Sequence, residues 1–373
     1  MSGKEPEMSV VAVIKHKDDH LASVTAALAA CGAEDLVSKG MRALVKPNLH
    51  GGDGTTSPEM MEAACRWAFE RGAAEVLLGD GPFWGMKDHD GYFRRKGVFQ
   101  AAEHTGARVV VLDHEPFRLF RPCSPHLPQE IGITELAFAC DMVINLPLMK
   151  THFNTLVTLG MKNLKGCIRP QDKRAFHEME LNRALVELNR LFKPHVTLMD
   201  AVTAFEGRGP SAATPVDLGL ALASRDVVRL DAVACFLMGI EPGEVRMLKL
   251  AAETGLGEIR MGRIQTVGES PQAHQRRFER PFDALRKRHP TLQVLNDGSC
   301  SGCDMNFFSA LQQCEKAQKP LRVSAVVLGR ATPPSSDALL IGHCTRPHWP
   351  GRQHVPGCPP REAEIAKSLA SES

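Results

Sequence analysis

Residues 142–152 read MVINLPLMKTH, an apolar run that ends in a lysine, a threonine and a histidine. Its first five residues, Met142–Leu146, are typical of a strand buried on both faces. Short apolar runs of the same kind recur at Val10–Ile14, Ala43–Lys46, Val76–Gly79, Arg108–Leu112 and Val196–Met199. Segments of helical composition separate them, so the sequence predicts an α/β fold. We expect a mostly parallel sheet covered by helices on both faces.

The helix boundaries carry capping signals. Leu21–Ala30 is a predicted helix, and Ser57-Pro58-Glu59 has the serine, proline and acid expected at the start of another. Asp226 is expected to cap a helix that runs to Leu237, although a functional role is the alternative. Asp231 falls inside that helix among apolar neighbours, where a charge needs a reason.

Composition restricts the class of protein. The chain has 373 residues, 43% of them hydrophobic, and a formal net charge of +2. The length suits two domains, and the balanced charge implies no polyanionic partner. Aromatic residues make up 5%, with one tyrosine, which argues against a base-stacking surface for nucleic acid. Residues 1–8 are polar and no apolar run is long enough for a bilayer, so we expect a cytoplasmic protein without a membrane anchor.

Polar side chains follow several of the predicted strands. Lys46 and Asn48 come after one strand, Asp80 after the next, and Lys150 and His152 after the run quoted above. The carboxyl ends of parallel strands form the edge where ligands bind. Lysines there suit a carboxylate or a phosphate, although lysines at strand ends are often only solvated charges. We therefore predict a basic pocket for a small anionic molecule, lined by Lys46, Lys150, Lys162 and Lys165.

Roles in this pocket follow from side-chain chemistry. The catalytic candidates are Lys150, His152 and Asp200, with His152 as an acid or base near neutral pH. The candidates for binding a substrate or cofactor are Lys46, Asn48, Lys162 and Asn163. Asp200 and Glu206 are expected to pair with lysines or bind a metal. The glycine-rich segment 51–54 is a weaker candidate for an anion site.

Several of these motifs, in order, resemble one family. They are Val45-Lys46-Pro47-Asn48, residues 145–152 (NLPLMKTH), residues 160–166 (GMKNLKG), Met199-Asp200-Ala201 and residues 223–226 (ASRD). Together they are similar to the domain of unknown function family 362 over roughly residues 9–265. The resemblance implies little about activity, although members often carry iron–sulfur modules of a ferredoxin-like kind.

Four cysteines near the C-terminus form the second set of candidates. Cys300 and Cys303 make a C-x-x-C turn, Cys344 follows Gly342-His343, and Cys358 stands in Val355-Pro-Gly-Cys-Pro-Pro360. Eleven cysteines in a reducing compartment are not a disulfide framework, and four thiolates together hold zinc or an iron–sulfur cluster. Cys314 competes as a ligand but is treated as a core residue.

This pattern resembles the proximal [4Fe-4S] site of the nickel–iron hydrogenase small subunit, with shorter spacing. The resemblance implies a [4Fe-4S] cluster on Cys300, Cys303, Cys344 and Cys358. A structural zinc site and four unrelated buried cysteines are the alternatives. We expect three segments: residues 9–265 as the α/β domain, 266–290 as a polar linker, and 291–373 as a small α/β iron–sulfur domain.

Three functions remain open at this point. The first is an oxidoreductase of anaerobic metabolism that passes single electrons from the cluster to the anionic molecule, with a second redox cofactor as an option. The second is an electron carrier or cofactor-assembly factor with a redox partner protein. The third is an enzyme with a structural zinc. The sequence does not give the oligomeric state.

Overall fold

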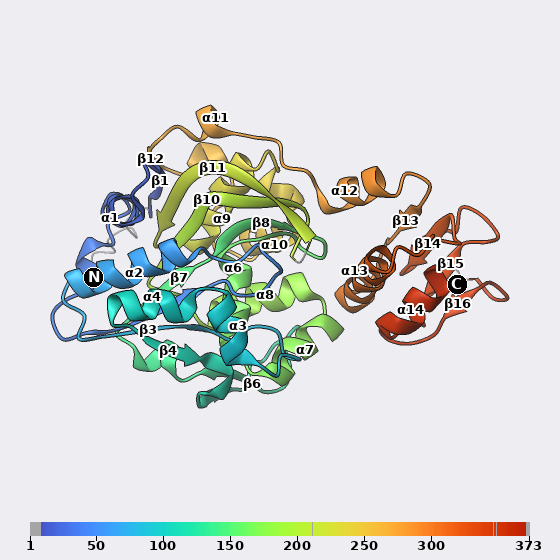
Figure 1. Ribbon diagram of the computed structural model, residues 1–373, viewed down its shortest axis with the longest axis horizontal. Helices are drawn as coiled ribbons and strands as arrows, with labels where there is room; N and C mark the ends of the chain where they lie inside the picture. The colour runs from blue at the N-terminus through green and yellow to red at the C-terminus, as the bar shows by residue number, and fades with distance from the viewer. Residues whose placement is uncertain (1–8, 211, 346, 348, 371–373) are drawn as a thin grey trace. The chain divides into compact units, whose positions relative to one another are not determined.

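The structure is a computed structural model that describes residues 9–210, 212–345, 347 and 349–370. It contains two compact units (Figure 1). The larger unit consists of Met1–Phe176 and Asn182–Arg280, and the smaller unit consists of His177–Leu181 and Pro281–Ser373. The segment 266–290, which the sequence analysis treats as a linker, contains a strand and two short helices.

A ten-stranded sheet is the centre of the larger unit, with the order β12-β1-β11-β10-β7-β2-β3-β4, and β8 joins β10 to β9. The strands are β1 (Val11–Lys15), β2 (Arg42–Pro47), β3 (Glu75–Asp80), β4 (Arg108–Val111), β7 (Met142–Leu146), β8 (Leu148–His152), β9 (Leu156–Thr158), β10 (Val196–Arg208), β11 (Ala212–Ser224) and β12 (Thr266–Gly268). Neighbours from β10 through β7, β2 and β3 to β4 are parallel. The α/β fold with a mostly parallel sheet is therefore confirmed.

Helices cover the sheet in two groups. The helices α1 (His20–Ala30), α2 (Pro58–Glu70) and α4 (Val98–Thr105) contact one another and the strands β1 to β4. The helix α9 (Val227–Leu237) contacts β10 and β11 together with α6 (Gly160–Asn163), α10 (Arg246–Glu253) and α11 (Pro271–His274). Alternate strand residues such as Val45, Leu78 and Ile144 pack in the core under the first group. Burial on both faces explains why these strands are almost wholly apolar.

The remaining elements lie wholly or mainly in the larger unit. They are α3 (His89–Arg95), α5 (Leu136–Ala139), α7 (Pro170–Glu178), α8 (Leu181–Leu191), β5 (Phe117–Phe120), β6 (Ile131–Thr134), and the 3-10 turns η1 (Glu34–Leu36), η2 (Leu112–His114), η3 (Leu164–Cys167), η4 (Pro242–Glu244) and η5 (Met261–Arg263). The strands β5 and β6 form a separate antiparallel pair.

The predicted helix caps are confirmed. The Ser57 hydroxyl accepts a hydrogen bond from the Met60 amide at 3.3 Å at the start of α2. Asp226 accepts from the amides of Val228 and Arg229 at 2.9 and 3.1 Å at the start of α9. Both side chains satisfy amides that a helix leaves without partners in its first turn.

The hairpin of β10 and β11 is the largest departure from the sequence-based expectation (Figure 1). We expected a short strand at Val196–Met199, whereas β10 continues to Arg208 and pairs antiparallel with β11. Gly207, Pro215 and Gly219 obscure the strand pattern, because glycine and proline are disfavoured in strands. The sheet is consequently mixed rather than purely parallel.

The smaller unit has a four-stranded parallel sheet with the order β13-β14-β15-β16. Its elements are α12 (Pro281–Arg288), β13 (Gln293–Leu295), α13 (Ser301–Lys316), β14 (Ala325–Leu328), β15 (Leu339–Ile341), β16 (His354–Val355) and α14 (Glu362–Leu369). The helices α13 and α14 pack against each other. Across the described residues of both units, we find no helix with the length and apolar character that crossing a membrane requires.

Candidate functional site

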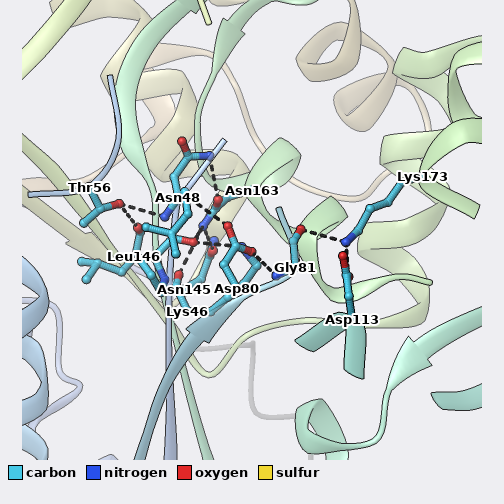
Figure 2. Close-up of polar contacts among 12 residues, drawn as sticks. Lys46, Asn48, Thr56, Asp80, Gly81, Asp113, Asn145, Leu146, Asn163 and Lys173 are labelled. Carbon is cyan, nitrogen blue, oxygen red and sulfur yellow. Dashed lines mark hydrogen bonds and ion pairs between the residues drawn. The ribbon is translucent and has the colours of Figure 1, made fainter. Parts of the chain in front are cut away.

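Two buried ion pairs lie at the carboxyl ends of the parallel strands in the larger unit (Figure 2). Lys46, at the end of β2, pairs with Asp80, at the end of β3, with 2.7 Å between Nζ and Oδ1. Lys173 on α7 pairs with Asp113 on η2 and donates to the Gly81 carbonyl at 2.8 Å. Each pair is nearly inaccessible to solvent, so each charge depends on its partner.

Three buried asparagines connect these strand ends by a chain of hydrogen bonds (Figure 2). The Asn48 amide donates to Asn163 Oδ1 at 3.0 Å, and the Asn163 amide donates to Asn145 Oδ1 at 2.8 Å. The Asn145 amide in turn donates to the Gly160 carbonyl at 3.0 Å. Every member both accepts and donates, which makes the network rigid.

Lys150 starts this chain and holds the loop after β2. Its Nζ donates to Asn48 Oδ1 at 2.8 Å, to the His50 carbonyl at 2.7 Å and to the Gly54 carbonyl at 2.6 Å. These three bonds occupy all three donors of an ammonium group. Burial, followed by the charge of Lys162, holds the pKa of Lys150 well below its ordinary value. The structure thus places Lys150 in the support of the loop that contains residues 48–54.

Lys162 and Asn163 are positioned by Asp231. Both carboxylate oxygens of Asp231 accept amides at the start of α6, from Gly160 at 2.7 Å and from Met161 at 2.8 Å. The side chain is fully buried, and burial raises the pKa of Asp231 to about 7 despite these bonds. The unexplained charge inside α9 therefore has a structural reason, which is to hold the short helix that carries Lys162.

Lys162 differs from Lys46 and Lys173, which are paired with aspartates. It is 8% exposed, and no carboxylate lies within ion-pair distance of it in the part of the chain that the structure describes. Burial lowers the pKa of Lys162 to about 7. An amine in this state is a ready acceptor of a proton or partner of an anion.

His50 lies among the lysines and was not predicted from the sequence. Burial, and then the charges of Lys162, Lys150, Lys165 and Lys173, hold the pKa of His50 well below its ordinary value. Its ring stacks on Phe83 with 5.9 Å between centroids, and Lys165 lies over the ring of Trp84 at 5.3 Å. We call Lys46, Lys150, Lys162, Lys165, Lys173, His50, Asp80 and Asp113 the lysine cluster.

The signal for the missed residues was present in the chain. His50 follows β2, two residues beyond Asn48. Asp113 follows β4 by two residues, and Asp80 is the last residue of β3. Applying the strand-end rule to every parallel strand would have included both residues. Lys173 lies on α7 and had no such signal.

The other candidates from the sequence make contacts outside the lysine cluster. Asp200 accepts from the Ser57 amide and hydroxyl at 3.0 and 2.8 Å, so it fixes the start of α2. His152 accepts from the Asn154 amide at 3.0 Å through Nδ1 and stacks on Phe153. Glu206 accepts from the Glu279 amide at 2.9 Å. The expected pairing of Asp200 and Glu206 with lysines is not what these bonds show, and the catalytic roles of His152 and Asp200 stay predictions.

The four cysteines of the smaller unit follow the carboxyl ends of its strands. Cys300 and Cys303 come after β13 at the start of α13, Cys344 after β15, and Cys358 after β16. Backbone bonds tie the last two segments together, from the Gly342 amide to the Val355 carbonyl at 3.0 Å and from the His343 amide to the Gly357 carbonyl at 2.9 Å. The parallel sheet therefore brings three distant segments to one edge. We call these four residues the cysteine group.

The thiols interact with one another. The hydrogen bond from the Cys303 thiol lowers the pKa of Cys300 to about 6, with the amides of Cys303 and Gly302 contributing. The same bond, followed by burial and the charges of Cys300 and Cys344, raises the pKa of Cys303. Burial and then the charge of Cys300 raise the pKa of Cys344, to which Cys358 also contributes. Each of the four thiols thus has an electrostatic effect on at least one other thiol of the group.

Gly342 leaves space beside these sulfurs. A β-carbon on Gly342 would lie 3.0 Å from Cys303 Sγ and 3.7 Å from Cys344 Sγ, and the residue has a φ of +95°. Cys314, in contrast, is buried and donates to the Ala366 carbonyl at 3.6 Å, as expected of a core residue. Within the described ranges, no three side chains of the His, Cys, Asp or Glu type are arranged to hold a metal ion.

Comparison with known proteins identifies the larger unit. A model of the family DUF362, a domain of unknown function, matches residues 43–236. The match includes every member of the lysine cluster and none of the cysteine group. The thylakoid-associated protein sll1697 of Synechocystis sp. (strain ATCC 27184 / PCC 6803 / Kazusa) is 29% identical over 243 residues, which cover 60% of this chain and 71% of sll1697.

Two solved structures are also similar. The lactate racemase apoprotein from Thermoanaerobacterium thermosaccharolyticum has a TM-score of 0.41 and 14% identity, over 62% of this chain and 57% of that one. A protein from Thermotoga maritima has a TM-score of 0.32 and 15% identity, over 54% and 55%. The chain therefore spans less than two thirds of either solved protein. Because the family model matches more than half of the 373 residues, this protein belongs to the DUF362 family.

Proposed function

We propose that this protein is an iron–sulfur oxidoreductase with a [4Fe-4S] cluster in the smaller unit and a small anionic substrate or cofactor in the larger unit. Cys300, Cys303, Cys344 and Cys358 would hold the cluster. The observation that carries the proposal is that the segments with these four cysteines follow β13, β15 and β16 at one edge of a parallel sheet.

The residues of the cysteine group suit such a ligand chemically. Four thiolates are the usual ligand set of a [4Fe-4S] cluster, which gives and takes single electrons when it is bound. The start of α13 favours a thiolate at Cys300, since the amides of Gly302 and Cys303 donate to its sulfur. Gly342 keeps the space beside Cys303 and Cys344 free of a side chain.

The lysine cluster supports the anionic partner. It contains five lysines and two aspartates, and the aspartates are already paired with Lys46 and Lys173. Excess positive charge in a poorly solvated place is stabilised by an anion. The proposal retains the predictions of a cytoplasmic location and of a redox partner protein that exchanges electrons with the cluster.

The first test is purification without oxygen, followed by iron, sulfide and zinc analysis and electron paramagnetic resonance before and after dithionite. We expect about four irons per chain and a signal that appears on reduction. One zinc and no iron would favour the structural zinc site, and the oxidoreductase proposal would fail.

Serine variants test the ligand assignment. Cys300→Ser, Cys303→Ser, Cys344→Ser and Cys358→Ser should each lose most of the iron, because each removes one thiolate. Cys314→Ser is the matched control and should keep it, since Cys314 bonds to Ala366 instead. Full iron content in any of the first four variants would contradict the assignment.

A further inference from the structure

Lys162 is a nearly buried amine with no anionic partner among the described residues. Lys46 and Lys173 have aspartate partners, and Lys150 donates to three neutral oxygens. Within the described residues, Lys162 has neither a carboxylate within ion-pair distance nor a hydrogen-bond acceptor. A nearly buried amine in this state is costly to the fold unless it serves a ligand.

Other residues fix the backbone of α6 on both sides of Lys162. Asp231 fixes the start of α6, and Asn163 fixes its end through Asn48, Asn145 and the carbonyl of Lys46. These buried bonds restrict the backbone on both sides of Lys162. A side chain held in this way is preorganised, which is what a recognition site requires.

Lys162 interacts electrostatically with His50 on the loop after β2, Lys150 on β8 and Lys165 on η3. These neighbours interact in turn with Lys173 on α7 and Asp80 on β3, and Lys173 interacts with Asp113 on η2. Asp80 and Asp113 are committed to Lys46 and Lys173. The site therefore lacks negative charge, and His50 is kept neutral by its lysine neighbours.

We propose that Lys162, with His50 beside it, binds a carboxylate or phosphate group of a small molecule and takes up a proton when the anion binds. The inference rests on the proposed function and names the contact for its anionic partner. An anion next to the amine favours the charged form and raises the pKa of Lys162 from about 7. The affinity should be constant at low pH and fall as the pH rises above about 7, because the free amine is then uncharged.

The experiment is isothermal titration of the full-length protein with oxalate and with inorganic phosphate at pH 7.5. Each titration is run in two buffers with different enthalpies of ionisation, so that the difference in heat gives the protons exchanged. We expect at least one of the two anions to bind with uptake of about 0.5 to 1 proton. Binding of oxalate alone would indicate a carboxylate, and binding of phosphate alone would indicate a phosphate group.

Two variants make the test specific. Lys162→Met should weaken binding at least about tenfold and abolish proton uptake, since a charge-assisted contact is lost. Lys162→Arg should keep binding without proton uptake, because its guanidinium is always charged. Lys249→Met, at an exposed lysine on α10, is the control and should bind like the wild type.

The result that would overturn the proposal is wild-type affinity with wild-type proton uptake in Lys162→Arg, or the absence of binding by both anions to the wild-type protein. If Lys162→Met fails to fold, Lys162→Arg alone decides. Failure of the cluster proposal is recognised separately: Cys344→Ser protein, which lacks iron if that proposal holds, should still bind the anion. Loss of anion binding with normal iron content refutes only the present inference.

Discussion

At the scale of single residues, the buried pair of Lys46 and Asp80 should be sensitive to substitution. Asp80 also accepts from the amides of Leu49 and Gly81 at 2.9 Å each, so one carboxylate joins three parts of the site. Removing its charge leaves Lys46 buried without a counter-ion. Such a loss is far more destabilising than the loss of an exposed pair.

We therefore predict that Asp80→Asn lowers the free energy of unfolding by about 3–5 kcal/mol. Urea unfolding followed by tryptophan fluorescence measures it, since Trp67 is buried in the core of the larger unit. Glu75→Gln is the matched control on the same strand. The ion pairs of Glu75 with Arg42 and Arg108 are partly exposed. Removing the Glu75 charge should therefore lower the free energy of unfolding by less than about 1 kcal/mol. Equal effects of the two substitutions would contradict the role of Asp80.

The unpaired Lys162 has a consequence for the pH dependence of stability. Its amine loses a proton at a pKa of about 7 in the fold, against an ordinary value of 10.5. Between these values the unfolded chain binds more protons, so stability rises with pH through this window. Below pH 7 the full penalty of the buried charge remains.

Lys162→Met removes this penalty. We expect the variant to be more stable than the wild type at pH 6, by on the order of a few kcal/mol, with the difference shrinking toward pH 10. Chemical denaturation of both proteins at pH 6, 7.5 and 9.5 in an anion-poor buffer measures this difference in the free energy of unfolding. A difference that stays constant over this range would show that the effect is packing alone.

At the scale of elements, the loop of residues 48–56 is ordered by donors that bind its carbonyls. Lys150 binds at His50 and Gly54, Tyr92 donates to the carbonyls of Leu49 and Gly51 at 2.7 and 3.1 Å, and Lys96 donates to Gly52. The conformation of the loop is therefore held by Lys150 on β8, Tyr92 on α3 and Lys96, which directly follows α3. Its own sequence, rich in glycine, would leave it mobile.

Lys150→Met should loosen this loop while leaving the sheet intact. We predict that hydrogen exchange of the peptide covering residues 48–56 becomes at least about tenfold faster, because three buried hydrogen bonds are lost. Lys96→Met, which removes one bond, should have a smaller effect. Unchanged protection in Lys150→Met would show that Tyr92 and Lys96 suffice. Anion binding should weaken only indirectly, since the donors of Lys150 are occupied.

At the scale of the whole molecule, the fold class and the strand ends could be predicted because burial on both faces leaves an apolar signature in β2, β3 and β7. The β10–β11 hairpin could not be predicted, because Gly207 and Pro215 mask the alternation of apolar and polar residues along its strands. Its place in the sheet is set by β1 and β7, which are distant in the sequence. Lys46 and Asn48 were proposed from their place at a strand end, whereas Lys162 and Asn163 were proposed from the motif of residues 160–166. The contacts of Asp200 could not be predicted, because they depend on Ser57, 143 residues away in the chain.

The cysteine group shows the same limit. The order of the four cysteines predicts one ligand group, and in the smaller unit the segments that carry them follow β13, β15 and β16 at one edge of the sheet. Side-chain roles such as those of Lys150 and Asp231 could not be predicted, because most of their partners are backbone atoms of loops and short helices. Such partners leave no residue-type signal in the sequence.

The asparagine chain described above has a consequence for the chemical ageing of the protein. Lys150 can only donate and the Gly160 carbonyl can only accept, so the amides of Asn48, Asn163 and Asn145 can point in one direction only. Hydrolysis of any one of them to aspartate would remove a donor and place two acceptors face to face. All three are followed by leucine, a bulky residue that hinders attack by the next backbone nitrogen on the side-chain amide. The durability of the site over time thus depends on three leucines that take no part in its hydrogen bonds through their side chains.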